Sequence, residues 1–328
     1  MPEVMNVTQA IRRTIAEEME RNKDIIYLGI DVREGVWGFT TGLVHQFGSE
    51  RILNTPINES AIVGMGVGAA LEGLHPVAEI MFEDFAMIAM DHLYNNMGTI
   101  HYMSNGQYSV PLTVLTVSGS GCKMGGGSGH GQCLQPLFMS IPGVAVCAPA
   151  TAYDARGLLL TALRAENPVI FSVNMFLAVF GPGESIPDEE YTVPFGMARV
   201  VRPGNDVTVV AASGMVRCAL ESAEELAEEG ISVEVIDPRT LSPLDSNTIM
   251  ESVAKTRRLV TVEESRAVCG VGAEILARIA CEDPTVLTAP AKRIAAPPIP
   301  IPAASHMEEW FVPNKAEISK QIRGLFSR

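Results

Sequence analysis

The stretch TPINESAIVGMGVGAALEG, Thr55 to Gly73, is the most informative part of this chain. Asn58 has the side chain of a helix N-cap, and Glu59 follows in the first turn, where a negative charge suits the positive end of the helix dipole. Glycine and alanine fill most of the rest, although each glycine inside a helix costs about 1 kcal/mol. We therefore expect a helix that packs closely against a neighbouring backbone, with Glu59 available for chemistry.

Length and composition predict a two-domain α/β protein. A chain of 328 residues exceeds the usual single domain, and each half can bury its own core. Hydrophobic residues make up 47% and charged residues 19%, which is typical of a compact oligomeric protein with much covered surface. A net charge of −14 without a basic stripe repels phosphate backbones, so we expect no nucleic-acid partner.

The N-terminus and the cysteines indicate a cytoplasmic protein. The first 22 residues have the pattern of an acidic amphipathic helix and not of a signal or transit peptide, and no apolar run reaches the roughly 18 residues of a membrane span. The six cysteines form neither a CxxC pair nor a metal-ligand spacing, so we expect no zinc site and no disulfide framework. They are Cys122, Cys133, Cys147, Cys218, Cys269 and Cys281.

Helix and strand patterns alternate along the first half of the chain. Such alternation predicts a mostly parallel sheet that is covered on both faces. A helix is predicted from Asn6 to Arg21, because apolar residues recur there every four positions. Strands are predicted at 24–32, 76–81, 110–119, 144–150 and 168–173, and further helices from Glu59, at 85–103 and at 152–165.

The second half repeats the alternation after a proline-rich segment. The segment 181–204 contains four prolines and little periodicity, so we place a linker at 186–204, between domains at 1–185 and 205–328. The fold class is thus α/β, with two three-layer α/β/α domains. In the second domain, strands are predicted at 206–213, 231–240 and 257–265 and helices at 216–230, 246–256 and 270–283; the proline-rich tail 296–306 should form an extended strap.

Two glycine-rich motifs and an aromatic pair each allow more than one interpretation. GMGVGA at 64–69 fits GxGxxA, but the strand that should precede a dinucleotide-binding turn is missing. GSGCKMGGGSGHGQC at 119–133 lacks a Walker pattern, since Lys123 comes too early. It is either a flexible surface loop or, as we favour, an active-site loop in which His130 exchanges protons. Phe82 and Phe85 could be core residues or could stack on a ligand.

The order of motifs resembles that of a known family. Besides 55–85, the motifs are MDHLYNN (90–96), GGGSGHGQC (125–133), PATAYDARGLL (149–159), NPVIF (167–171), VIDPRTLSPLD (235–245) and GVGAEI (270–275). The chain resembles the beta subunit of the thiamine-diphosphate-dependent first component of 2-oxoacid dehydrogenase complexes, a family that includes pyruvate, branched-chain 2-oxoacid and acetoin dehydrogenases. The resemblance implies a transketolase-type pyrimidine-binding domain followed by a transketolase C-terminal domain.

The resemblance also implies roles for particular residues. Glu59 matches the carboxylate that hydrogen-bonds the aminopyrimidine ring of thiamine diphosphate and promotes its imino tautomer. Phe85, beside Phe82, matches the aromatic residue that stacks on this ring. His130 matches the loop histidine that stabilises or protonates the carbonyl-derived oxygen, or that assists acyl transfer. A K⁺ site formed by backbone carbonyls would fall on Leu112, Ala162, Ala165 and Asn167.

The family's GDG…N segment, which holds Mg²⁺ and the diphosphate, is absent from this sequence. The resemblance therefore implies that an alpha subunit supplies these ligands in an α₂β₂ assembly, that this chain is inactive alone, and that a lipoyl acyltransferase core is a further partner. The expected reaction is decarboxylation of a 2-oxoacid, or cleavage of acetoin, with acyl transfer to lipoamide. The alternatives are the C-terminal half of a split transketolase that moves a two-carbon ketol unit, and a non-catalytic scaffolding subunit.

Four positions depart from the family pattern. Ile30 stands where relatives have an acid in the polar passage between two active sites, which puts communication between the sites in question. Gly131 replaces the serine of HSQ, and His101 and Leu115 replace frequent arginines. These changes are expected near the substrate channel, so they leave the side chain of the substrate open and allow a specialised ketol chemistry.

Overall fold

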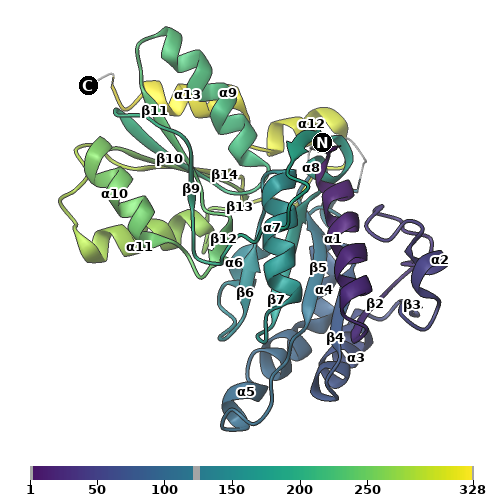
Figure 1. Cartoon of the computed structure of the whole chain (residues 1–328). Coiled ribbons are helices and arrows are strands. Elements are labelled where there is room, and N and C mark those ends of the chain that lie inside the picture. The colour runs from purple at the N-terminus through teal and green to yellow at the C-terminus, as the bar shows by residue number, and fades with distance from the viewer. Residues whose placement is uncertain (1–2, 121–125, 327–328) are drawn as a thin grey trace. The chain divides into compact units, whose positions relative to one another are not determined.

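The chain folds into two compact units, shown in the computed structural model of Figure 1, which describes residues 3–120 and 126–326. Unit 1 comprises Met1–Ser118 and Leu137–Phe195, and unit 2 comprises Gly119–Pro136 and Gly196–Arg328. The glycine-rich loop thus belongs to unit 2, although unit 1 flanks it in sequence on both sides. Short helix α6 (Gln135–Phe138) lies where the chain passes back into unit 1.

A parallel sheet with strand order β6-β7-β5-β4-β2-β3 forms the centre of unit 1. Every residue of β5 and β7 is buried, as expected for strands that are covered on both faces. The strands are β2 (Ile25–Gly29), β3 (Ile52–Asn54), β4 (His75–Ile80), β5 (Thr113–Ser118), β6 (Ala145–Cys147) and β7 (Val169–Asn174).

Helices cover both faces of this sheet. The crossovers β3→β4 and β6→β7 run in opposite directions across the strand order, so right-handed connections put α3 (Glu59–Leu71) and α7 (Ala152–Leu163) on opposite faces. Helix α1 (Val7–Arg21) packs beside α7 (Figure 1). Asn6 caps α1 by accepting a hydrogen bond from the backbone N–H of Gln9 (2.9 Å). The three-layer α/β/α architecture predicted from the sequence is therefore confirmed for this unit.

The helix predicted at 85–103 is wrong as a single element. The chain forms α4 (Glu83–Ala86), the 3₁₀-helix η1 (Met87–Ala89), the π-helix η2 (His92–Met97) and α5 (Ile100–Met103). Gly98 follows the last residue of η2 and lies close to the loop that contains Ile141. A Cβ at this position would be only 2.7 Å from Ile141 Cγ2. The π-helical turn and this close approach interrupt the regular α-helix predicted at 85–103.

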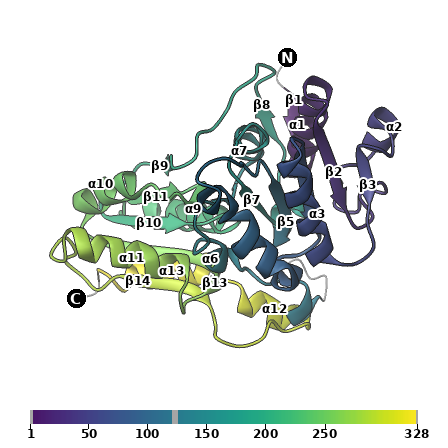
Figure 2. The same cartoon turned by 90° about the horizontal axis from the view of Figure 1, so that it is seen from below.

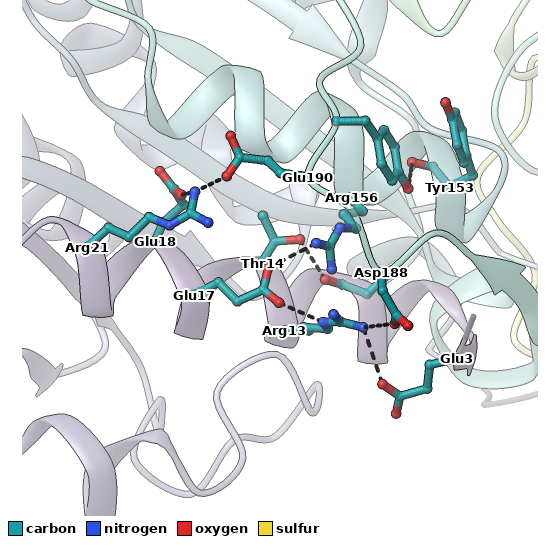
Figure 3. Close-up of polar contacts among 12 residues, drawn as sticks. Glu3, Arg13, Thr14, Glu17, Glu18, Arg21, Tyr153, Arg156, Asp188 and Glu190 are labelled. Atoms are coloured by element: carbon teal, nitrogen blue, oxygen red, sulfur yellow. Dashed lines mark hydrogen bonds and ion pairs between the residues drawn. The ribbon is translucent and has the colours of Figure 1, made fainter. Parts of the chain in front are cut away.

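Two short strands and a group of ion pairs secure the ends of unit 1. β1 (Glu3–Met5) pairs antiparallel with β8 (Glu184–Ile186), about 180 residues later in the chain (Figure 2). Arg164, directly after α7, forms an ion pair with Glu190, which follows β8 (Nη1 to Oε1, 2.8 Å). The buried Arg156 of α7 forms another with Glu17 of α1 (Nη2 to Oε2, 3.1 Å). Figure 3 shows Arg156 and Glu17 among the polar contacts that join α1 to α7 and to the chain after β8. The remaining helices are α2 (Leu43–Phe47) and α8 (Met175–Phe180).

Unit 2 has a sheet with strand order β14-β13-β10-β11-β9, in which β9 alone runs antiparallel to its neighbour. α9 packs with α13 and α10 packs with α11, on opposite faces of the sheet (Figure 1). The strands are β9 (Arg199–Arg202), β10 (Val207–Ala211), β11 (Val233–Asp237), β13 (Leu259–Arg266) and β14 (Lys292–Ala296), with β12 (Thr240–Ser242) as a further short strand. The helices are α9 (Met215–Glu228), α10 (Ser246–Thr256), α11 (Val271–Glu282), α12 (Ser305–Phe311) and α13 (Lys315–Arg323).

Two proline-rich segments behave differently. Of the strap predicted at 296–306, residues 297–304 form neither helix nor strand, as their proline content predicts, whereas Ala296 ends β14 and Ser305 begins α12. The stretch expected as a linker, 186–204, contains β9 at the edge of the sheet of unit 2. Pro194 and Pro203 lie outside that strand, so the prolines bound a strand instead of preventing one.

Candidate active site

Glu59 is the first residue of α3 and is 4% exposed. Asn58 caps the helix as predicted, because its side-chain oxygen accepts a hydrogen bond from the backbone N–H of Ala61 (3.0 Å). Among residues 3–120 and 126–326, no hydrogen bond or ion pair reaches the Glu59 carboxylate. A nearly buried acceptor at the positive end of a helix can thus take a hydrogen bond from a bound molecule.

Gly64 and Gly66 of α3 lie close to neighbouring side chains, whereas Gly68 does not. A Cβ on Gly66 would lie 2.9 Å from Leu112 Cδ1, and one on Gly64 would lie 3.2 Å from the imidazole of His92. A Cβ on Gly68 would meet nothing within 4 Å. Gly64, Gly66 and Ala69 lie inside the helix, so the GxGxxA pattern cannot form the strand-to-helix turn of a dinucleotide site.

Three aromatic rings form a cluster near α3. Phe82, the N-cap residue of α4, packs edge-on against Trp37 (centroids 5.2 Å apart) and Phe85 (5.8 Å). Trp37 is fixed by its indole N–H, which donates to the carbonyl of Met81 (3.0 Å). Phe85 is half-buried on α4, which contacts α3, so the structure brings the Glu59 and Phe85 elements together. The sequence did not predict a role for Trp37, because only tertiary packing places it beside Phe82.

A buried polar cluster supports α4 at the carboxyl ends of β5 and β7. Glu83 is fully buried, and the hydroxyl of Ser172 donates to its Oε1 (2.5 Å). Ser118 Oγ lies 3.1 Å from Ser172 Oγ. In parallel sheets this end of the strands is where ligands bind. The sequence reasoning missed this cluster, although hydroxyl residues at the ends of apolar strands were a usable signal.

His130 lies in unit 2, in the loop that precedes α6. It is exposed and follows the 3₁₀-helix η3 (Gly127–Gly129). Gln132, two residues later, accepts a hydrogen bond from Arg266 of β13 (2.6 Å). Cys122 and Lys123 of the same loop lie outside the described residues.

The four residues suggested for a K⁺ site lie around the C-terminus of α7 and the start of β5. The carbonyl of Leu112 accepts from the N–H of Val169 (2.9 Å), and that of Ala162 accepts from the N–H of Ala165 (3.2 Å). A carbonyl oxygen has two lone pairs, so Leu112 keeps capacity for an ion, whereas the Ala162 carbonyl also accepts from the N–H of Arg164 and has both lone pairs engaged. Asn167 lies between α7 and β7, in the same turn region as Ala165.

The residues that depart from the family pattern occupy different environments. Leu115 is fully buried in β5 and is a core residue. His101 is exposed on α5, and its Nδ1 lies 2.8 Å from the carbonyl oxygen of Tyr108. Ile30 is half-buried directly after β2.

Residues 3–120 and 126–326 contain no group of three or more His, Cys, Asp or Glu side chains that could hold a metal ion. No helix in the described chain combines the length and the apolar composition needed to cross a bilayer.

Comparisons with known proteins identify both units. Residues 3–175 match the model of the transketolase pyrimidine binding domain, and residues 196–318 match that of the transketolase C-terminal domain. A solved structure described as a split gene transketolase, an inactive beta4 tetramer, superposes with a TM-score of 0.77 at 22% identity and covers 99% of each chain. At this identity the likeness shows the fold alone.

Curated relatives are similar over nearly the whole chain. The Arabidopsis thaliana protein "Pyruvate dehydrogenase E1 component subunit beta-1, mitochondrial" is 43% identical over 322 residues, which are 96% of this chain and 87% of the relative. The Cupriavidus necator protein "Acetoin:2,6-dichlorophenolindophenol oxidoreductase subunit beta" is 38% identical over 335 residues and covers 98% of both. The chain therefore belongs to the transketolase-like, thiamine-diphosphate-dependent family of dehydrogenase beta subunits that its motifs predict.

Proposed function

We propose that this chain is the beta subunit of a heteromeric thiamine-diphosphate enzyme that decarboxylates a 2-oxoacid, or cleaves acetoin, and passes the acyl group to lipoamide. The observation that carries the proposal is the environment of Glu59. Its carboxylate is nearly buried and has no partner in the described part of the chain. It lies at the N-terminus of α3, a helix that contacts α4, which bears Phe85. The names of the relatives support the reaction class.

The residues of unit 1 fit the aminopyrimidine half of the cofactor. When bound, thiamine diphosphate supplies a thiazolium carbon that can add to a substrate carbonyl group. The Glu59 carboxyl group would hydrogen-bond a nitrogen of the pyrimidine ring and share with it the proton that the tautomeric change requires. Phe85 offers the face of a half-buried ring for stacking, and Phe82 and Trp37 fix the orientation of that ring from its edge.

His130 is the proposed second catalytic residue. An imidazole can give or take a proton near neutral pH, so it can protonate the oxygen derived from the substrate carbonyl or assist transfer of the acyl group. The exposure of His130 within unit 2 supports this role, because a substrate or a lipoyl group must be able to reach it.

An alpha subunit completes the proposed enzyme. The absence of a GDG…N segment supports a partner that holds Mg²⁺ and the diphosphate, in an α₂β₂ assembly that is active only when complete. Unit 1 exposes large apolar side chains that a partner could cover, among them Ile57 (81% exposed) and Ile88 (63%). A lipoyl acyltransferase core as a further partner and K⁺ at the carbonyls of Leu112, Ala162, Ala165 and Asn167 belong to the same proposal.

A cytoplasmic location is part of the proposal. Five described cysteines form no disulfide, as a reducing compartment favours. They are Cys133, Cys147, Cys218, Cys269 and Cys281.

The test is reconstitution with an alpha subunit. We would co-purify the two chains, add thiamine diphosphate and Mg²⁺, and follow reduction of a dye with pyruvate, branched-chain 2-oxoacids, acetoin or ketose phosphates. Turnover of a 2-oxoacid or acetoin that requires both chains is the expected result. Turnover of ketose phosphates alone would favour a split transketolase. A stable complex that needs no Glu59 for turnover would favour a scaffolding subunit.

A further inference from the structure

Arg266, at the end of β13, contacts three separate segments of unit 2. Its Nη1 donates a hydrogen bond to Gln132 Oε1 in the His130 loop (2.6 Å), and its Nη2 donates to the carbonyl of Ile299 (3.1 Å). Its guanidinium carbon lies 5.9 Å from the centroid of the Phe311 ring on α12. One half-buried cation thus joins the loop, residues 297–304 and α12.

The loop and residues 297–304, which we call the strap, also touch each other directly. Ser128 Oγ donates to the carbonyl of Ile301 (3.0 Å). A Cβ on Gly127 would lie 3.2 Å from Ala303 Cβ, and one on Gly131 would lie 3.5 Å from Ile301 Cδ1. A Cβ at Gly131 would therefore make only an ordinary van der Waals contact with the strap, and its tightest neighbour would be Ser120 Cβ (3.3 Å).

The contacts of Gln132 show how Arg266 can act on the loop. The side chain of Gln132 accepts from Arg266 through its oxygen and donates from Nε2 to the carbonyl of Ser128 (3.0 Å). It thereby closes the short turn that contains His130. Because glycine-rich backbone is conformationally permissive, a turn of this composition needs such external contacts to keep one geometry.

We propose that Arg266 is a positioning residue that, through Gln132, holds His130 in one place against the strap. The inference rests on the proposed role of His130 in the reaction. A displacement of about 1 Å can cost 10²-fold in rate, so loss of the Arg266 contacts should lower turnover although Arg266 touches no substrate. Since Glu59 and Phe85 belong to unit 1, binding of thiamine diphosphate should be unchanged.

The test compares Arg266→Met with a matched variant, Arg278→Met, in the reconstituted complex. Arg278 is an exposed arginine of the same unit that bonds Glu274 (2.7 Å) and Ser246 (2.9 Å). In Arg266→Met we expect hydrogen exchange to become several-fold faster in peptides covering both 126–136 and 297–304. We also expect kcat to fall about 10²-fold with an unchanged KM for thiamine diphosphate. Arg278→Met should leave all three quantities at their wild-type values.

Gln132→Leu removes the same hydrogen bond without altering β13, so it keeps the test valid if Arg266→Met fails to fold. It should reproduce the faster exchange of 126–136 and the lower kcat, whereas 297–304 keeps its contacts with Arg266 and should exchange as in wild type. In kcat, the double variant should be no worse than the more impaired single variant. Wild-type hydrogen exchange in both variants would show that Arg266 does not hold the loop. Faster exchange with a wild-type kcat would overturn the positioning role. A wild-type complex that turns over neither 2-oxoacids nor acetoin would refute the proposed function, and the exchange rates would still decide whether Arg266 holds the loop.

Discussion

The hydroxyl of Tyr27 donates a hydrogen bond to the carboxyl group of Glu79, and both side chains are buried in unit 1. Tyr27 lies on β2 and Glu79 on the adjacent parallel strand β4. Burial raises the pKa of Glu79 to about 7, while the hydrogen bond from Tyr27 acts in the opposite direction. Burial also raises the pKa of Tyr27 well above its usual value, so that Tyr27 remains a neutral donor.

The first prediction is a pH-dependent stability that originates at Glu79. Its folded pKa of about 7 lies above the ordinary 4.5, so this group stabilises the fold fully below pH 4.5, and that contribution is lost as the pH rises through 7. As the pH rises from 4.5 to above 7, titration of Glu79 should lower the free energy of unfolding by about 3 kcal/mol. Urea unfolding of wild type and Glu79→Gln between pH 5 and 8.5 measures it.

Glu79→Gln should lose most of this pH dependence, because glutamine does not titrate. The matched control is Glu50→Gln, which changes an exposed glutamate of the same unit and should follow the wild-type curve. Parallel curves for wild type and Glu79→Gln would show that Glu79 is not the group responsible.

The second prediction concerns Glu59. In the reconstituted complex, Glu59→Gln should lower turnover roughly 10²–10⁴-fold, since the amide cannot hold the proton that the carboxylate shares with the pyrimidine ring. The melting temperature should stay close to wild type, because no hydrogen bond to this carboxylate occurs among the described residues. The control is Glu72→Gln at the exposed C-terminal end of the same helix. Wild-type turnover by Glu59→Gln would remove Glu59 from the mechanism.

The third prediction separates Phe85 from an ordinary surface ring. Phe85→Ala should raise the KM for thiamine diphosphate about 2- to 10-fold, which corresponds to the 0.5–1.5 kcal/mol of a stacked aromatic pair. Phe180→Ala, which truncates a 56% exposed ring on α8 of the same unit, should leave that KM unchanged. Equal effects of the two substitutions would argue against stacking on the cofactor.

The sequence predicts the site wherever its signals are local. The cap at Asn58, the start of α3 at Glu59 and the end of α9 before Gly230 follow from residues within one or two turns. Gly230 has a φ of +81°, a conformation that side chains other than glycine rarely adopt. These elements have the predicted positions because their determinants are short-range.

Features that depend on distant segments escaped prediction. The bond between Arg266 and Gln132 joins residues 134 positions apart, and no pattern around either residue signals the other. β9 becomes a strand only because β11 offers it an edge. The division of the 85–103 region into short helices likewise depends on packing of Gly98 against Ile141, which lies far along the chain. Tertiary contacts, and not local propensity, determine these features.

The last prediction tests why α3 is rich in glycine. Both Gly66→Ala and Gly68→Ala gain about 1 kcal/mol of helix propensity. At Gly68 the new methyl group meets nothing within 4 Å, so this variant should be more stable than wild type. At Gly66 it would lie 2.9 Å from Cδ1 and 3.3 Å from Cδ2 of Leu112, so this 1% exposed side chain would have to shift within the core. Overpacking of this kind costs about 1–3 kcal/mol and should outweigh the gain.

Thermal unfolding of the isolated chain measures the difference between the two variants. Gly68→Ala should raise the melting temperature by a few degrees, and Gly66→Ala should lower it. The added methyl group and the helix are the same in both, so a difference in sign can come only from the surroundings of each glycine. If both variants melted above wild type, Leu112 would have yielded to the new methyl group. The glycine at position 66 would then not be required for the packing of α3 against the sheet.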